Sequence, residues 1–221
     1  MSNTGNPKGS SFQPQKGESQ LPARLEELRA GLRQVSPYTL AFHTGATYQA
    51  DPDGGGSFKI MAWGQEVSLS YPGLVATDPI SGKELGADVQ GLLLYYFTTS
   101  NGVPEEGRWI SFSELPGGKF YNQAFQGYTG HELVKAFGSD EAALRRACEG
   151  LGGKLEELGD MAYSFRALPL VRVGLVYWRG DEDFPPSAQV LFDAMAGHHL
   201  PTDVCAGLGG TLTRRLVRRL E

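Results

Sequence analysis

The chain has 221 residues, of which 40% are hydrophobic and 20% are charged, as in an ordinary globular protein. Its formal net charge of -5 argues against general nucleic-acid binding, which usually requires a basic patch or a basic domain. Its two cysteines, Cys148 and Cys205, are too few for a disulfide framework, an iron–sulfur cluster or a four-thiolate zinc site.

The sequence also carries expectations about compartment and domain organisation. No apolar run approaches the roughly 18 residues that a transmembrane helix needs, and the N-terminus lacks the apolar core of a signal peptide. Residues 1–20 are rich in Ser, Gly, Asn, Gln, Pro and Lys, a composition that predicts a disordered tail. We therefore expect a cytoplasmic protein with one domain over residues 21–221.

Helical and alternating patterns follow one another in the first half of the chain. Leucines at helical spacing predict a helix over Leu21–Gln34. Alternating apolar residues predict a strand over Tyr38–Tyr48, and two further strands over Phe58–Trp63 and Gln65–Tyr71. A strongly apolar stripe predicts a helix over Ala87–Thr98. This half should therefore contain an antiparallel meander flanked by helices.

The second half mixes the same two patterns. The strand predicted over Leu170–Trp178 is apolar on both faces, which is typical of a central strand. Two helices should close the chain, the second with Thr202 as its N-cap. The fold class is therefore α+β, a single domain with a mostly antiparallel sheet, several packed helices and a C-terminal helix pair. The other predicted elements are a strand at Trp109–Phe112, two helices within Lys119–Phe137, a helix from N-cap Ser139 through Leu151, a strand at Tyr163–Ala167, and the closing helices Pro186–Ala196 and Thr202–Leu220.

Several familiar catalytic and nucleotide-binding motifs are absent from the sequence. It has no glycine-rich dinucleotide fingerprint, no phosphate-binding P-loop and no G-x-S-x-G nucleophile elbow. His131 and Glu132 begin a zinc-protease pattern, but Lys135 stands where its second histidine should be. The potentially reactive groups are instead concentrated in residues 180–215.

An acidic run opens this block at Asp181, Glu182 and Asp183. The first interpretation is that these acids cap the helix predicted after them, because carboxylates favour helix N-termini. The alternative is a carboxylate site for a hard cation or an amine, to which Asp181 would contribute.

Two adjacent histidines follow at His198 and His199. The simpler interpretation is that one of them caps a helix C-terminus while the other packs. The alternative assigns His198 as a general acid/base oriented by Asp193 or Asp203, and His199 as a metal ligand.

The last predicted helix contains three interior glycines, Gly207, Gly209 and Gly210. Each costs about 1 kcal/mol relative to alanine, so we expect a compensation, either close backbone packing or a flat ligand lying on this face. Arg172 lies in the apolar strand and needs a partner, either a carboxylate of the acidic run or a substrate anion. Tyr121 could line a pocket.

Three segments together resemble a known family. They are WISFSELPGGKFY at 109–121, GDEDFPPSAQVLFDAMAGHHLPTD at 180–203 and GQEVSLSYP at 64–72. They resemble the domain-of-unknown-function family numbered 3786, found mainly in anaerobic bacteria and archaea. Some members resemble fusions to a small iron–sulfur domain similar to that of corrinoid proteins, which implies a link to metallocofactor or one-carbon metabolism. This chain lacks the cysteines of that domain.

Three functional hypotheses follow. The leading one is a cytoplasmic accessory or binding protein for a metallocofactor, corrinoid or other tetrapyrrole or iron–sulfur related, or for its carrier protein, in anaerobic metabolism. The cofactor in this hypothesis is implied by the resemblance alone. The second is a small-molecule enzyme in which His198 and Asp203 form an acid–base pair and Arg172 binds an anion. The third is a structural subunit of a larger complex. None of the three includes nucleic acid or a membrane.

Overall fold

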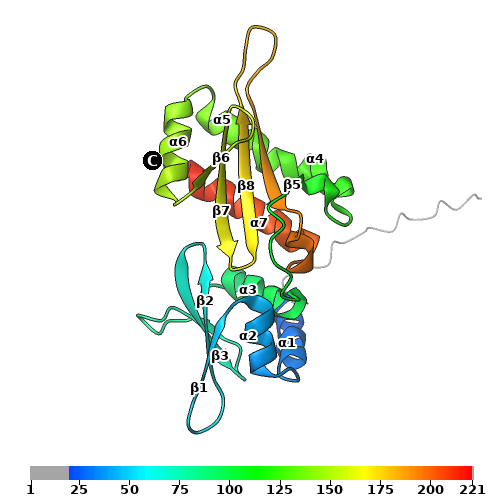
Figure 1. Cartoon of the computed structure of the whole chain (residues 1–221), viewed down its shortest axis with the longest axis vertical. Coiled ribbons are helices and arrows are strands. Elements are labelled where there is room, and N and C mark those ends of the chain that lie inside the picture. Colours follow the sequence, from blue (N-terminus) through cyan, green and yellow to red (C-terminus); the bar gives the residue numbers. More distant parts are fainter. Residues whose placement is uncertain (1–19, 221) are drawn as a thin grey trace, which may run out of the picture.

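The computed structural model describes residues 20–220, which form two halves, each a sheet with its own helices (Figure 1). The first half contains β1–β4 and α1–α3, and the second contains β5–β9 and α4–α7. One hydrophobic core cluster includes residues of both halves, from Leu25 to Leu216. The predicted tail over residues 1–20 lies outside the described part, except for Gln20, which begins α1.

The first half is built on a four-stranded antiparallel meander in the order β1–β2–β3–β4. Side chains alternate along β2, so that Phe58 and Ile60 are buried while Lys59 is exposed. Its helices are α1 (Gln20–Leu32), α2 (Pro37–Thr44) and α3 (Ala87–Thr99). Its strands are β1 (Thr47–Ala50), β2 (Gly56–Ala62), β3 (Gln65–Tyr71) and β4 (Ala76–Thr77).

The strand predicted over Tyr38–Tyr48 is wrong, because α2 occupies most of that segment. Pro37 stands in the first turn, where its missing N–H and fixed φ suit a helix. Gly45 ends the helix with a φ of 65°, a left-handed conformation that glycine adopts readily. Leu40 and Thr44, four residues apart, are the buried positions. Over so few residues, the apolar spacing that predicted a strand also fits one face of a short helix.

The second half is a five-stranded antiparallel sheet in the order β5–β9–β8–β7–β6. The predicted central position of the apolar strand is confirmed, since β8 lies between β7 and β9. The strands are β5 (Trp109–Ser111), β6 (Lys154–Glu156), β7 (Met161–Leu168), β8 (Val171–Trp178) and β9 (Ser187–Asp193). The helices are α4 (Gly118–Tyr128), α5 (Gly130–Phe137), α6 (Glu141–Gly150), α7 (Thr202–Val217) and the short 3-10 helices η2 (Phe112–Glu114) and η3 (Ala196–His198).

The helix predicted over Pro186–Ala196 is also wrong, because this segment forms strand β9. Ala188, Val190 and Phe192 are buried at every second position, as in a strand. Because β9 is an interior strand between β5 and β8, Gln189 and Leu191 on its other face are half-buried rather than exposed, and Asp193 is buried. The sequence therefore lacks a clean alternation. The predicted C-terminal helix pair is therefore replaced by a strand, η3 and α7, while the α+β class with mostly antiparallel sheets is confirmed.

Two predicted helix caps are corrected as well. Thr202 does not cap α7 with its side chain, because its hydroxyl donates to the carbonyl of Pro116 at 2.7 Å. Asp140, rather than Ser139, caps α6, and its carboxylate accepts a hydrogen bond from the backbone N–H of Ala143 at 2.9 Å.

A partly buried hydrogen bond to Tyr96 joins the two halves. The hydroxyl of Tyr96 on α3 donates to the carbonyl of Thr44 at 2.8 Å and accepts from the backbone N–H of Leu170 at 3.2 Å. Burial raises the pKa of this Tyr96 hydroxyl to about 12. Within residues 20–220, no helix combines the length and apolar character needed to cross a bilayer.

Candidate ligand-binding groove

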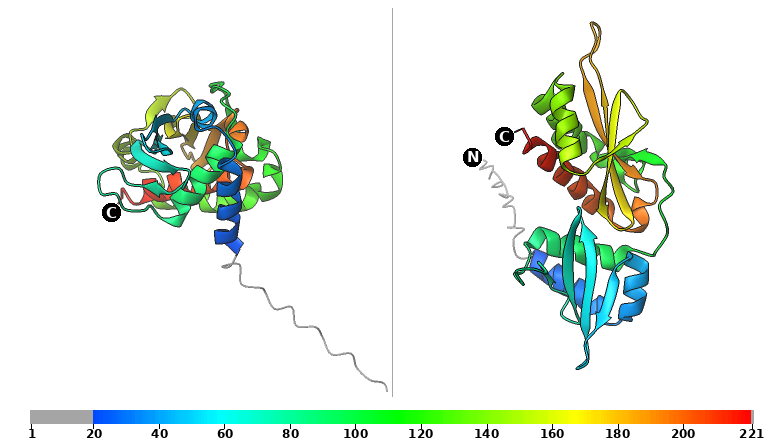
Figure 2. Two further views of the ribbon diagram at one scale, coloured as in Figure 1. Left: turned by 90° about the horizontal axis from the view of Figure 1, so that it is seen from below. Right: turned by 60° about the vertical axis from the view of Figure 1, so that its left-hand side comes forward.

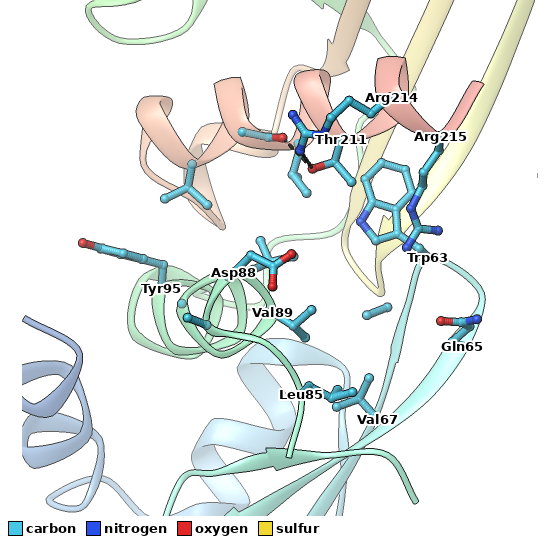
Figure 3. A pocket seen from close by; sticks show the side chains of 17 residues that line it. Trp63, Gln65, Val67, Leu85, Asp88, Val89, Tyr95, Thr211, Arg214 and Arg215 are labelled. Carbon is cyan, nitrogen blue, oxygen red and sulfur yellow. Dashed lines mark hydrogen bonds between the residues drawn. The ribbon is translucent and has the colours of Figure 1, made fainter. Parts of the chain in front are cut away.

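A groove of about 530 Å³ lies between the two halves (Figure 3). Its walls come from the β2–β3 hairpin and α3 of the first half and from α7 of the second. This volume falls in the range of small-molecule sites. The largest aliphatic side chains that line it are Val67, Leu85, Val89, Leu92, Val204 and Leu208.

Trp63 stands at the tip of the hairpin in an unusual backbone conformation. Ala62 pairs with Gln65, so Trp63 and Gly64 form a two-residue turn, with φ angles of 51° and 78°. Positive φ at both positions is typical of a type I′ turn, which favours Asn-Gly. A bulky residue with positive φ is strained by roughly 1–3 kcal/mol. Because such strain persists where the surroundings or the function require it, Trp63 is a candidate functional residue.

Two arginines of α7 lie at the same end of the groove. The guanidinium of Arg215 lies over the Trp63 ring, 5.1 Å from its centroid, and partial burial lowers the pKa of Arg215 below its usual range. The guanidinium of Arg214 donates to the hydroxyl of Thr211 at 3.0 Å. Neither arginine forms an ion pair with an acid in the part of the chain that the structure describes. This end of the groove therefore favours an anion.

The face of α7 toward the groove changes from apolar to basic along the helix. Val204, Leu208, Thr211 and Arg215 follow one another at spacings of three and four residues, which place them on one side of the helix. Figure 3 shows Arg214 and Arg215 at the C-terminal end of this face, with the apolar end beyond Thr211. A ligand lying along α7 would therefore contact an apolar surface toward the N-terminal end of the helix and a cationic surface toward its C-terminal end.

The opposite wall, on α3, contributes the Asp88 carboxylate and the aromatic ring of Tyr95, whose hydroxyl is directed away from α7 in Figure 3. Asp88 lies in the first turn of α3 and Tyr95 two turns later. Figure 3 shows the Asp88 carboxylate directed into the groove. Asp88 is not ion-paired with Arg214 or Arg215. The groove thus has an acid on one wall and two cations on the other.

A family model described as a domain of unknown function, DUF3786, matches residues 36–215. The chain belongs to the DUF3786 family. The match confirms the resemblance and includes every residue that lines the groove, from Ala62 to Arg215. No curated protein and no solved structure has a significant match to this DUF3786 chain.

The three α7 glycines of the DUF3786 protein have different surroundings. A Cβ on Gly209 would lie 2.6 Å from the ring of Phe125, and one on Gly210 would lie 3.4 Å from the ring of Tyr128. Gly209 therefore lets α4 approach α7 closely, whereas a Cβ on Gly210 would make an ordinary contact with Tyr128. A Cβ on Gly207 would have no neighbour within 4 Å, and Gly207 lines the groove. Close packing thus accounts for Gly209, while Gly207 keeps the groove open.

The structure does not bring His198 and Asp203 together. His198 is exposed in η3, with Nδ1 3.2 Å from the side-chain amide of Asn101. Asp203 is exposed in the first turn of α7, and its carboxylate accepts a hydrogen bond from the N–H of Val204 at 3.0 Å. Asp193 is buried and accepts hydrogen bonds from three backbone N–H groups, the closest at 2.8 Å, rather than orienting a histidine. None of these side chains lines the groove.

The two residues proposed as metal ligands are also apart. His199 is fully buried, with Nδ1 2.8 Å from the hydroxyl of Ser100. Asp181 is exposed in the β8–β9 turn, where its carboxylate accepts from the N–H groups of Asp183 and Phe184. The acidic run therefore shapes a hairpin turn and caps no helix. Across residues 20–220, no cluster of three His, Cys, Asp or Glu side chains is arranged to hold a metal.

Arg172 has the partner that its position in an apolar strand requires, but the partner is not in the acidic run. Its guanidinium pairs with Glu156, donates to the hydroxyl of Ser164 at 2.7 Å and lies over the Trp109 ring, 5.0 Å from the centroid. These contacts occupy the side chain away from the groove. Tyr121 is exposed on α4 and does not line the groove either.

Of the predicted site residues, only Gly207 lies in the groove. The groove residues that sequence reasoning missed are Trp63, Asp88 and Tyr95. The sequence carried one signal for Trp63. This residue directly precedes Gly64 at the junction of two predicted strands, and at this position a two-residue turn favours asparagine. Asp88 and Tyr95 carry no such signal, since the groove assembles from elements far apart in the chain.

Proposed function

We propose that this protein is a binding protein whose groove holds an amphipathic organic anion. The observation that carries the proposal is the change from Val204 and Leu208 to Arg214 and Arg215 along one face of α7. The apolar body of the ligand would lie against the aliphatic residues, and its carboxylate, sulfonate or phosphate would meet the arginines. Guanidinium groups bind such anions through paired, charge-assisted hydrogen bonds.

Burial supports an anion at this position. Partial burial of Arg215 disfavours its charged form, as its lowered pKa indicates. A ligand anion would replace part of the hydration that the guanidinium has lost, whereas a neutral ligand would not. Asp88 on the opposite wall would then select against a second anionic group near α3 and favour a hydrogen-bond donor there.

The metallocofactor implied by the family resemblance fits this groove poorly. Its lining has no histidine, cysteine or methionine, the side chains that commonly ligate haem iron. Tyrosine also ligates haem in some proteins, but the hydroxyl of Tyr95 is directed away from α7 and the groove in Figure 3. The groove would match the apolar surface and acidic substituents of an organic molecule, so we propose a cytoplasmic binding or accessory role without a metal ligated by these residues. The enzyme and structural-subunit hypotheses gain no specific support from the groove.

A titration with two matched dyes tests the proposal. Anilinonaphthalene sulfonate has an apolar aromatic body and an anionic group, and N-phenyl-1-naphthylamine has nearly the same body without the sulfonate. Both should show saturable fluorescence enhancement with the native protein. Arg214→Gln/Arg215→Gln should weaken binding of the sulfonate dye by roughly tenfold, equivalent to about 1.4 kcal/mol. It should weaken binding of the neutral dye much less. Equal effects on the two dyes would contradict the anion site.

A second substitution tests the location. Gly207→Leu should fill the groove and weaken binding of both dyes by at least roughly tenfold. Gly127→Leu is the matched control, because Gly127 also lies in a helix, also has no neighbour within 4 Å of a built Cβ, and is outside the groove. Loss of binding in both variants, or in neither, would overturn the assignment of the groove.

A further inference from the structure

The arginines of this chain divide into an ion-paired group and an unpaired group. Those paired with a carboxylate are Arg24, Arg29, Arg33, Arg108, Arg166, Arg172 and Arg179. The others have no ion pair with any acid between residues 20 and 220, and all of them lie on α6, on α7 or directly after α7. They are Arg145, Arg146, Arg214, Arg215, Arg218 and Arg219.

Four of the unpaired arginines are exposed outside the groove, and we call them the α6–α7 arginine surface. They are Arg145 and Arg146 on α6, and Arg218 and Arg219 after α7. The guanidinium of Arg219 lies 3.7 Å from the Cβ position of Gly150, the last residue of α6. Figure 2 shows the end of α7 beside α6. The surface therefore spans two packed helices and adjoins the basic end of the groove.

Helix electrostatics explain only part of this surface. A cation at a helix C-terminus is favourable, which accounts for Arg218 and Arg219. Arg145 and Arg146 lie in the middle of α6, whose last turn has no basic residue. Arg214 and Arg218 are like charges four residues apart at the end of α7, and such a pair destabilises a helix by about 0.2–0.5 kcal/mol. An anionic partner would reverse this repulsion.

We propose that the α6–α7 arginine surface docks an acidic segment of a protein partner. All four side chains are arginines although the chain also has lysines, and arginine pairs with carboxylates in a bidentate geometry. The net charge of -5 repels an extended polyanion such as nucleic acid at long range, whereas a short acidic segment meets only the local positive surface. The proposal is independent of the groove, although docking would place the partner beside the groove's basic end.

Fluorescence anisotropy with a short labelled oligoglutamate peptide tests the proposal. The variant Arg145→Gln/Arg146→Gln/Arg218→Gln/Arg219→Gln should bind the probe at least roughly fourfold more weakly, because each of four exposed ion pairs contributes about 0.2–1 kcal/mol. The control Lys59→Gln/Lys83→Gln/Lys119→Gln/Lys154→Gln removes the same charge from exposed lysines elsewhere, and should change affinity by less than about twofold. Far-UV circular dichroism should show that both variants remain folded; otherwise Arg218→Gln/Arg219→Gln replaces the first.

The outcomes separate this surface from the groove. The arginine variant should still bind N-phenyl-1-naphthylamine as the native protein does, since its four residues do not line the groove. Absence of oligoglutamate binding to the native protein, or an equal loss in the lysine control, would overturn the proposal. Tighter binding of a single-stranded DNA of matched charge would also overturn it, in favour of a nucleic-acid site.

Discussion

The guanidinium of Arg215 lies 5.1 Å from the centroid of the Trp63 ring. This contact joins α7 of the second half to the β2–β3 turn of the first. The backbone N–H of Trp63 also donates to the carbonyl of Ala167 on β7, at 2.9 Å. Trp63 is thus held by the second half through both its ring and its backbone. A ligand anion at Arg215 would act where the two halves meet.

Trp63→Asn should separate binding from folding. Asparagine relieves the strain of a positive φ, about 1–3 kcal/mol, but gives up the packing of a half-buried ring of similar magnitude, so the free energy of unfolding should change by less than about 2 kcal/mol. Affinity for anilinonaphthalene sulfonate should fall about fivefold to tenfold, because Arg215 loses the ring that positions it. Trp178→Asn, on a partly exposed tryptophan outside the groove, should leave dye affinity unchanged. Unchanged affinity in Trp63→Asn would remove Trp63 from the site.

Alanine at two neighbouring glycines should have opposite effects on stability. Gly209→Ala places a Cβ 2.6 Å from the Phe125 ring, so the free energy of unfolding should fall by about 1–3 kcal/mol. Gly207→Ala meets open space in the same helix and should raise stability by up to about 1 kcal/mol, because alanine favours helix. Urea denaturation measures both. Equal effects would mean that α4 does not pack against Gly209 as the structure shows.

Both thiols should be unreactive in the folded protein. Burial raises the pKa of Cys148 and that of Cys205 to about 12, so almost no thiolate exists at neutral pH. Ellman's reagent should therefore label neither cysteine in native buffer and both in guanidinium chloride. Rapid labelling of the native protein would show that α6 or α7 opens easily.

Helices and strands with a long, regular apolar pattern were predicted correctly more often than elements that are buried on both faces. Thirteen-residue helix α3 and central strand β8 carry long apolar patterns, and both are confirmed. The apolar pattern predicted the wrong element at α2 and at β9, where packing against neighbouring elements determines the structure. Phe192, for example, is buried in an interior strand, yet its spacing from Ala188 also fits a helix. Local periodicity does not contain the pairing with β5 and β8 that decides between them.

The candidate site was less predictable than the fold. The histidines and acids proposed as site residues instead form local structural hydrogen bonds. Asp193, for example, accepts hydrogen bonds from three backbone N–H groups. The groove depends on how Trp63, Asp88 and Arg215 come together from a turn and two helices. The sequence shows which residues are reactive, but the distance between elements far apart in the chain follows only from their packing.

His199 should make stability depend on pH. Its side chain is fully buried, and burial lowers its pKa below the ordinary value of 6.5, an effect only partly offset by the Val103 backbone and the carboxylates of Asp193 and Glu105. As pH falls below 6.5, the unfolded chain therefore takes up a proton that the folded protein resists. The free energy of unfolding should decrease from pH 7 toward pH 5, by at most about 1.4 kcal/mol per pH unit from this group.

Urea denaturation at a series of pH values checks this slope. In His199→Asn the amide Nδ2 stands near the position of imidazole Nδ1, so the hydrogen bond to Ser100, 2.8 Å long in the native protein, can persist without a titrating group. This variant should lose part of the slope between pH 7 and pH 5. His131→Asn, on an exposed histidine of α5, should keep the native slope. If the His199 variant also keeps it, the buried imidazole accepts its proton as readily in the folded protein as in the unfolded chain, and the packing around Ser100 admits a charge.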